Sequence, residues 1–259
     1  MKIAITGSTG RVGGRVAQRL LESSTESVAE SQIVRLTRRD APYEDVSALR
    51  AALKGVDTLV FVSSDGEAAR MIAHHQNVLQ AAADAGVGHV VLLSGLDSAL
   101  DSPFCYAYTN GFTEQMLRGS GLGYSIARAG LFAEFFGGLV RQVAADGTVR
   151  LPTGGCSVSL VARDDVADCL AALALAGPTN RHHDLTGEQS LSGADVAAAA
   201  GYAFEECPEA EFAASLTLGG EEPWWVYAYT SMFAAIRQNR WSAVSDEVNR
   251  LLGRPAARI

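Results

Sequence analysis

The sequence predicts an α/β fold, a doubly wound parallel sheet followed by a smaller C-terminal lobe. Three observations support this. Short apolar runs alternate with amphipathic helical segments over the first half of the chain. These runs are apolar on both faces, which is typical of strands in a parallel sheet covered by helices on each side. The first run ends in a glycine-rich turn that leads directly into a helical pattern.

The predicted elements follow in regular order over the first 130 residues. Strands are expected at residues 2–6, 32–37, 58–62, 89–94 and 124–128. Helices are expected between them, at residues 11–22, 45–54, 68–85 and 103–118. Gly55 and Gly86 follow two of these helices and are typical helix stops. Right-handed crossovers then place a ligand crevice at the carboxyl ends of the strands.

The pattern loosens after about residue 130, where glycine and proline interrupt it. Helices are predicted at residues 164–176 and 194–200, with a short strand at residues 183–186. Two or three helices follow Glu209. Residues 131–259 are therefore expected to form the smaller lobe, with part of this segment returning to the sheet.

Composition excludes several classes of partner. The net charge is −8 and the pI is about 5.1, so no basic face is expected for nucleic acid or for an anionic membrane surface. The four cysteines are scattered without a Cys-x-x-Cys pair, which favours reduced thiols. No signal peptide or membrane-spanning run is evident, and a cytoplasmic protein is expected. No metal site is predicted, since neither histidine pair has ligands at suitable spacing.

The glycine-rich turn predicts a dinucleotide site. A Gly-x-x-Gly-x-x-Gly pattern between a strand and a helix allows a tight turn, close approach of a pyrophosphate, and close packing of the helix on the sheet. The helix N-terminus then offers unpaired N–H groups to the phosphates. The residues expected to bind the cofactor here are Gly7, Ser8, Thr9, Gly10, Arg11, Val12 and Gly13.

The end of the second strand indicates which dinucleotide is bound. NAD sites commonly place an acidic residue there, whereas NADP sites use arginine. No acid follows this strand, and Arg38 is placed to reach a 2′-phosphate, with Arg11 as a second candidate. The alternative is that Arg38 and Arg39 are only solvated loop charges. The sequence therefore favours NADP(H), with NAD(H) as the weaker choice.

Together these motifs resemble the NmrA-like family of atypical short-chain dehydrogenases, especially members of the NAD(P)H:quinone oxidoreductase type. The resemblance extends over essentially the full chain. It is carried by residues 7–13, 56–60, 75–78, 85–87, 93–94, 113–117, 128–132, 163–167, 184–187 and 252–255, with Arg38. It implies a Rossmann-like dinucleotide-binding domain at residues 1–130 and a substrate-binding lobe at residues 131–259.

The chain departs from this family after the second strand. Members usually have a helix and a third strand there, but only residues 40–44 stand before the next helix. Either the element has been lost or a stretch of chain is missing at this point. The contacts to adenine are therefore in question.

The resemblance implies that the reactive end of the cofactor lies over residues 62–64, Ser94, Tyr106 and the loop at residues 129–132. Val62, Ser63 and Ser64 are expected to contact the cofactor, and Ser94, Tyr106 and Asn110 to be catalytic. In short-chain dehydrogenases a lysine four residues after the tyrosine lowers the pKa of the phenol. Asn110 occupies that position. An unperturbed phenol has a pKa of about 10, so Tyr106 is expected to donate a hydrogen bond but to be a poor base.

The loss of lysine disfavours alcohol oxidation but is compatible with quinone reduction, which needs little acid catalysis. We therefore expect an NADP(H)-dependent oxidoreductase that passes hydride to a quinone or similar small conjugated carbonyl. The alternative is a non-catalytic NAD(P)-binding redox sensor that acts through a protein partner. The sequence does not decide whether the protein is a homodimer.

Aromatic residues are dense in the C-terminal lobe and suit a planar substrate. For Trp224 and Trp225 a substrate wall and a core role are equally favoured. Tyr229, Phe233 and Ile236 fall at helical spacing, which favours the core.

Overall fold

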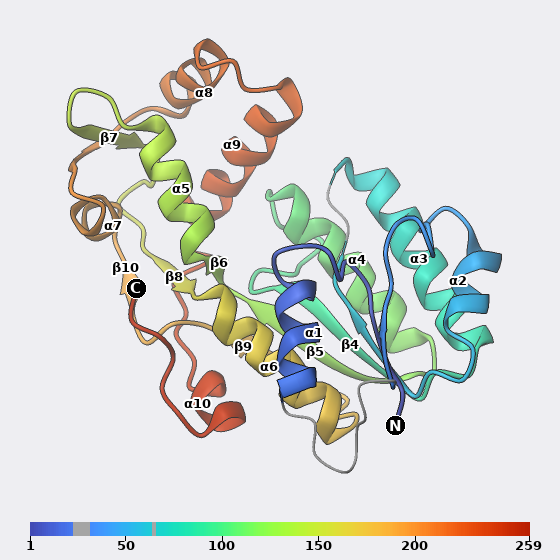
Figure 1. Cartoon of the computed structure of the whole chain (residues 1–259). Coiled ribbons are helices and arrows are strands. Elements are labelled where there is room, and N and C mark those ends of the chain that lie inside the picture. The colour runs from blue at the N-terminus through green and yellow to red at the C-terminus, as the bar shows by residue number, and fades with distance from the viewer. Residues whose placement is uncertain (23–31, 64–65) are drawn as a thin grey trace.

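The computed structural model describes residues 1–22, 32–63 and 66–259 (Figure 1). Among these residues, six parallel strands form one sheet in the order β2-β1-β3-β4-β5-β9. The strands are β1 (Ile3–Ile5), β2 (Ile33–Arg35), β3 (Thr58–Phe61), β4 (His89–Gly95), β5 (Gly123–Ala129) and β9 (His182–Leu185).

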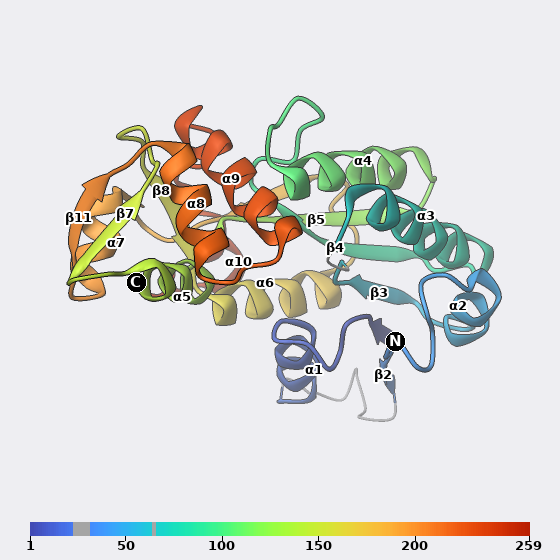
Figure 2. The same ribbon diagram turned by 90° about the horizontal axis from the view of Figure 1, so that it is seen from above.

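Helices cover both faces of this sheet (Figure 2). One face carries α1 (Gly13–Glu22), α6 (Arg163–Ala176) and α10 (Glu247–Leu252). The other carries α2 (Val46–Ala52), α3 (Ala68–Asp84) and α4 (Cys105–Gly119). Each face has its own apolar core, and β1, β3 and β4 contribute alternate side chains to the two cores. The predicted doubly wound parallel sheet is confirmed.

The remaining elements of the second half form a separate lobe at one end of the sheet (Figure 1). It contains the strand sets β10-β8-β6 and β11-β7. Its apolar core is built mainly from α5, α8 and α9 and from strands β7 and β8. The elements are β6 (Leu131–Phe132), α5 (Ala133–Val143), β7 (Thr148–Leu151), β8 (Val158–Val161), β10 (Ser190–Leu191), α7 (Gly193–Ala199), β11 (Ala203–Glu206), α8 (Glu209–Leu218) and α9 (Pro223–Arg237).

Not all of the second half belongs to this lobe. Strand β9 pairs with β5 at the edge of the main sheet, and α6 packs beside α1. The C-terminal segment is held there as well, because Arg254 forms ion pairs with Asp165 and Asp168 of α6, both at 2.7 Å.

The predicted elements differ from the observed ones mainly at their ends and in the lobe. Helix α1 begins at Gly13 rather than at residue 11, because residues 7–12 form the turn. Asp45 lies outside α2 and caps it, accepting a 2.9 Å hydrogen bond from the Ala48 amide. Neither α5 nor the short strands of the lobe were predicted from the sequence. Strands of two to four residues are too short to show a clear periodicity, and Gly137 and Gly138 interrupt the pattern of α5.

Throughout the residues described, no helix combines the length and the apolar character that crossing a membrane would require.

Candidate active site

A cavity of about 910 Å³ lies where the strands of the main sheet end and the lobe begins. Its wall includes residues at the carboxyl ends of five strands: Thr6, Leu36, Val62, Gly95 and Ala129. The cavity therefore occupies the crevice expected of a doubly wound sheet.

The structure places most of the predicted site residues on this one cavity. Ser8 is the exception among those described, since it is buried and its Oγ donates to the Leu36 carbonyl at 3.0 Å. Ser64 lies outside the described residues. The predicted residues that line the cavity are Gly7, Thr9, Gly10, Arg11, Val12, Gly13, Arg38, Val62, Ser63, Ser94, Tyr106 and Asn110.

The glycine turn has a backbone that side chains would disrupt. Gly7 has a φ of 59°, in the left-handed region that favours glycine. A Cβ on Gly13 would lie 2.4 Å from the Gly7 carbonyl oxygen, so α1 can start this close to the turn only with glycine there. The N–H groups of Thr9, Arg11 and Val12 donate to no acceptor in the described part of the chain. Such amides at a helix start can receive phosphate oxygens.

Arg38 lines the cavity and follows β2 in the chain. Its side chain is exposed and forms no ion pair with any described residue. The neighbouring wall comes from Ala41, Tyr43 and Glu44, which belong to the short segment before α2. This segment is held in place, because the Tyr43 hydroxyl donates to the Val62 carbonyl at 3.0 Å.

Three contacts join the same segment to α3. His74 and Arg70 lie 3.1 and 3.0 Å from the Glu44 carboxylate, and Asn77 donates to the Tyr43 carbonyl at 2.9 Å. Burial raises the pKa of Tyr43 to about 12, so its phenol stays protonated and remains a donor. The shortened segment therefore forms a wall on the side where adenine contacts were in question.

A buried carboxylate, that of Glu114 on α4, accepts the hydroxyl proton of Ser94 at the end of β4 in a hydrogen bond. The two Glu114 oxygens accept from Arg128 at 2.9 and 2.6 Å, and Ser94 Oγ donates to Oε1 at 2.7 Å. Burial alone would raise the pKa of Glu114, but the hydrogen bonds from Arg128 and Ser94 lower it overall. The carboxylate is thus ionised and can only accept, so the single hydroxyl proton of Ser94 is committed to it.

Tyr106 and Asn110 stand one turn apart on α4 and both line the cavity. The Tyr106 hydroxyl accepts from the Gly66 amide at 3.4 Å. Asn110 lies against Gly95, where an added Cβ would be 3.3 Å from its Nδ2. Glycine at position 95 therefore leaves space for the Asn110 amide at the end of β4.

Aromatic rings form the wall contributed by the lobe. Phe135 stacks on Tyr229, with ring centroids 6.0 Å apart and planes 25° apart, and Trp225 lies 6.0 Å from Tyr229 at 32°. All three line the cavity. Helical spacing favoured the core for Tyr229, and Tyr229 does pack against the lobe core, but it also lines the cavity, which the spacing does not reveal.

The other residues predicted for the core or the substrate wall differ in where they lie. Phe233 and Ile236 are fully buried in the lobe, as predicted. Trp225 belongs to the cavity wall, whereas Trp224 packs on the lobe core and does not line the cavity. Sequence reasoning missed Phe135, which has no signal beyond its position on an amphipathic helix.

Comparison with known proteins identifies the family. A family model described as NAD(P)H-binding matches residues 7–176. The chain belongs to this NAD(P)H-binding family. An NmrA-like family domain-containing oxidoreductase of Aspergillus flavus is 28% identical, over 68% of this chain and 62% of that protein. The resemblance to NmrA-like atypical short-chain dehydrogenases is confirmed.

Bacterial relatives within this NAD(P)H-binding family align over more of the chain. Quinone oxidoreductase 2 of Escherichia coli is 31% identical, over 83% of this chain and 80% of that protein. An NAD(P)H azoreductase of Xenophilus azovorans is 27% identical, over 98% of this chain and 94% of that protein. At the level of enzyme class, the prediction of an NAD(P)H-dependent oxidoreductase is confirmed.

A solved structure shares the whole fold. The NADPH-dependent quinone oxidoreductase QOR2 of Escherichia coli, complexed with NADPH, has a TM-score of 0.89 and 27% identity, covering 99% of this chain and 96% of that one. The alignment therefore includes the lobe as well as the parallel sheet.

Proposed function

We propose that this protein is an NADP(H)-dependent oxidoreductase that transfers hydride to a quinone or a similar small conjugated carbonyl. The observation that carries the proposal is the single cavity shared by the glycine turn, by Tyr106 and Asn110, and by the aromatic wall of the lobe. A dinucleotide and a planar acceptor could therefore meet in one enclosed space. The names of the quinone oxidoreductase relatives support the same reaction class.

The chain's own residues fit NADP(H). The close packing at Gly13 suits a diphosphate, and so do the amides of Thr9, Arg11 and Val12, which have no acceptor within the described part of the chain. Arg38 offers a guanidinium after β2 that pairs with no acidic group among the described residues, at the place where an NAD site would have a carboxylate. The bound cofactor would supply the hydride.

The remaining task of the protein is to orient the acceptor and stabilise its oxygen. Tyr106 and Asn110 carry an O–H and an N–H₂ donor into the cavity, and neither side chain is positively charged. Hydrogen bonds from such donors stabilise the negative charge that develops on a quinone oxygen during reduction. Ser94 cannot serve in this way while its proton is held by Glu114, so we assign it a positioning role at the end of β4.

The test uses purified protein with NADPH and a panel of benzoquinones. The proposal predicts oxidation of NADPH that depends on the quinone, followed at the absorbance band of the reduced nicotinamide. Tight binding of NADPH without turnover on any quinone would contradict it and would favour the redox sensor instead.

A further inference from the structure

Arg163, the first residue of α6, lies in an unusual position for a charged side chain. It is 7% exposed, and what remains accessible faces the cavity, which it lines. Its guanidinium carbon lies 5.2 Å from the centre of the Phe132 ring, also on the cavity wall. Stacking on a ring holds a guanidinium in place while leaving its N–H donors available at the edge.

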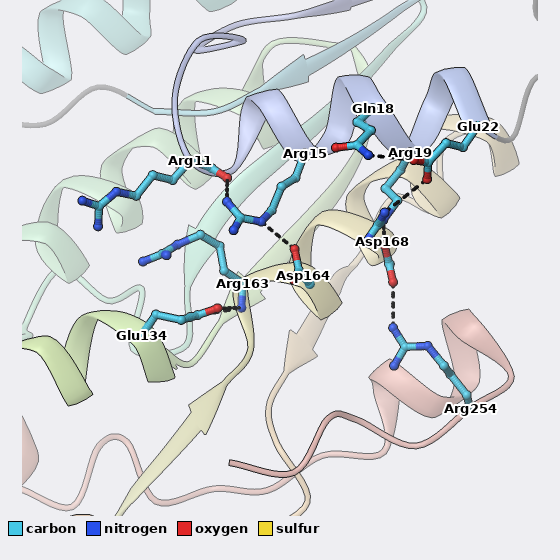
Figure 3. A network of polar contacts seen from close by, with 10 residues as sticks. All are labelled: Arg11, Arg15, Gln18, Arg19, Glu22, Glu134, Arg163, Asp164, Asp168 and Arg254. Carbon is cyan, nitrogen blue, oxygen red and sulfur yellow. Dashed lines mark hydrogen bonds and ion pairs between the residues drawn. The ribbon is translucent and has the colours of Figure 1, made fainter. Parts of the chain in front are cut away.

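The nearby carboxylates do not neutralise Arg163. Both oxygens of Glu134 accept from its backbone amide, at 3.1 and 3.3 Å, and Asp164 pairs with Arg15 at 2.5 Å. The Arg163 guanidinium forms no hydrogen bond or ion pair with any of the residues that the structure describes. Figure 3 shows its side chain extending to the same side as that of Arg11, whereas Arg15 turns toward Asp164.

This arrangement is costly without an anion. Burial lowers the pKa of Arg163, and the positive charges of Arg11 and Arg15 lower it further, against the opposing effect of Glu134 and Asp164. A buried cation without a hydrogen-bonded partner is normally avoided in proteins. A ligand with negative charge at this part of the cavity would satisfy Arg163 and Arg11 together.

We propose that Arg163 and Arg11 jointly bind the diphosphate of the dinucleotide, in addition to the amides of the glycine turn. This inference rests on the cofactor assigned in the proposed function. Arg11 belongs to the glycine turn itself, and α6 packs beside α1, so both arginines lie next to the turn that receives phosphate. Arg38 is separate from them, after β2, and suits the 2′-phosphate. Two guanidinium groups match the two negative charges of a diphosphate.

The experiment measures the affinity of Arg163→Gln for NADPH, NADH and 2′-AMP by calorimetry. The first two ligands contain the diphosphate, and 2′-AMP contains only the 2′-phosphate. Arg163→Gln should weaken the binding of NADPH and of NADH to a similar degree, by roughly 10- to 100-fold. Its affinity for 2′-AMP should stay within about twofold of the wild-type value. Arg141→Gln is the matched control, because Arg141 carries the same charge but is exposed on α5 and does not line the cavity; it should change each affinity by no more than about threefold.

The outcomes separate this inference from the proposed function. Unchanged affinity of Arg163→Gln for NADPH and NADH would overturn the role of Arg163 and leave the cofactor assignment standing. A loss for NADPH alone would also overturn it, since the contact would then be to the 2′-phosphate. If the wild-type protein binds neither dinucleotide, the proposed function and this inference both fail.

Folding of the variant can be checked independently. Because Arg163 is repelled by Arg11 and Arg15, the melting temperature of ligand-free Arg163→Gln should not fall by more than about 3 °C. If Arg163→Gln does not fold, Arg163→Lys keeps the charge but loses the planar fork, and an intermediate loss of affinity for both dinucleotides is expected. Wild-type affinity in that variant would count against the proposal.

Discussion

Ser94 donates its hydroxyl proton to Glu114, with 2.7 Å between Oγ and Oε1, and both residues are buried. The sequence suggested that Ser94 is catalytic. Because Glu114 is also held by Arg128 and Arg118, its carboxylate stays in place and keeps the serine proton. Ser94 therefore links β4 to α4, the helix that carries Tyr106 and Asn110.

Replacing Ser94 should affect stability more than turnover. Ser94→Ala removes a buried hydrogen bond to a charged group, which should cost about 1.5–3 kcal/mol in the free energy of unfolding. Turnover of a benzoquinone should stay within about threefold of wild type, because the donors facing the acceptor remain. Urea unfolding and steady-state kinetics on the same preparation measure the two effects. A large fall in kcat at unchanged stability would return Ser94 to the mechanism.

Tyr106 and Asn110 should show the opposite pattern. Tyr106→Phe and Asn110→Ala each remove a hydrogen-bond donor from the cavity. Each should lower kcat for benzoquinone roughly 3- to 30-fold. This is less than the loss of such a donor costs in acyl transfer, because quinone reduction needs little acid catalysis. Tyr108→Phe is the matched control, since Tyr108 is on the same helix but exposed and outside the cavity wall. If all three variants turn over at the same rate, α4 contributes no donor to the reaction.

The choice between the two cofactors should depend on Arg38. Arg38→Gln removes the guanidinium assigned to the 2′-phosphate, so the Kd for NADPH should rise roughly 10- to 100-fold while that for NADH changes little. The neighbouring Arg39 is exposed and does not line the cavity, so Arg39→Gln controls for the loss of one surface charge. Parallel titrations of both nucleotides check this, and equal affinities in wild-type protein would contradict the assignment.

Stability should fall as the pH drops from 6.5 to 5, because of two buried histidines. Burial lowers the pKa of His75 and of His89 from 6.5 to about 4, so both stay neutral in the folded protein. The unfolded chain takes up a proton on each imidazole below pH 6.5, which favours unfolding as the pH falls. Each histidine should cost about 1–2 kcal/mol over this interval.

Urea titrations of His75→Gln at the two pH values test the contribution of one site. Carboxylates contribute little between pH 6.5 and 5, because they remain ionised in the unfolded chain. The variant should lose about half of the pH dependence that the two histidines provide together. An identical dependence in the variant and the wild type would contradict the assignment to His75.

The first 130 residues were predictable because their signals are local. An apolar run, a glycine stop and a capping residue each act within a few residues, and they located every strand of the main sheet in that half. The glycine turn and Arg38, which line the cavity, were predicted for the same reason, since each is recognised from its position directly after a strand. In the lobe, short strands and an interrupted helix carry weaker signals, and α5 was missed together with Phe135.

The roles of individual side chains depended on contacts that no local pattern contains. Tyr229 packs on the lobe core and also lines the cavity because of where α9 lies relative to α5, with Phe135 stacked against it. Neither position can be derived from the spacing of residues on one helix. A two-residue difference in a helix boundary changes little, but the face that a helix presents to the cavity decides which residues can meet a substrate.

The sequence by itself determined the order of strands and helices over the first 130 residues, the dinucleotide turn and the absence of a lysine at position 110, since each depends on neighbours along the chain. Only the tertiary structure decided that the Ser94 proton belongs to Glu114, 20 residues away, and that Arg163 shares a cavity with Arg11. These relationships arise from the packing of α4 against β4 and of α6 against α1, and burial and charge pairing are properties of that packing.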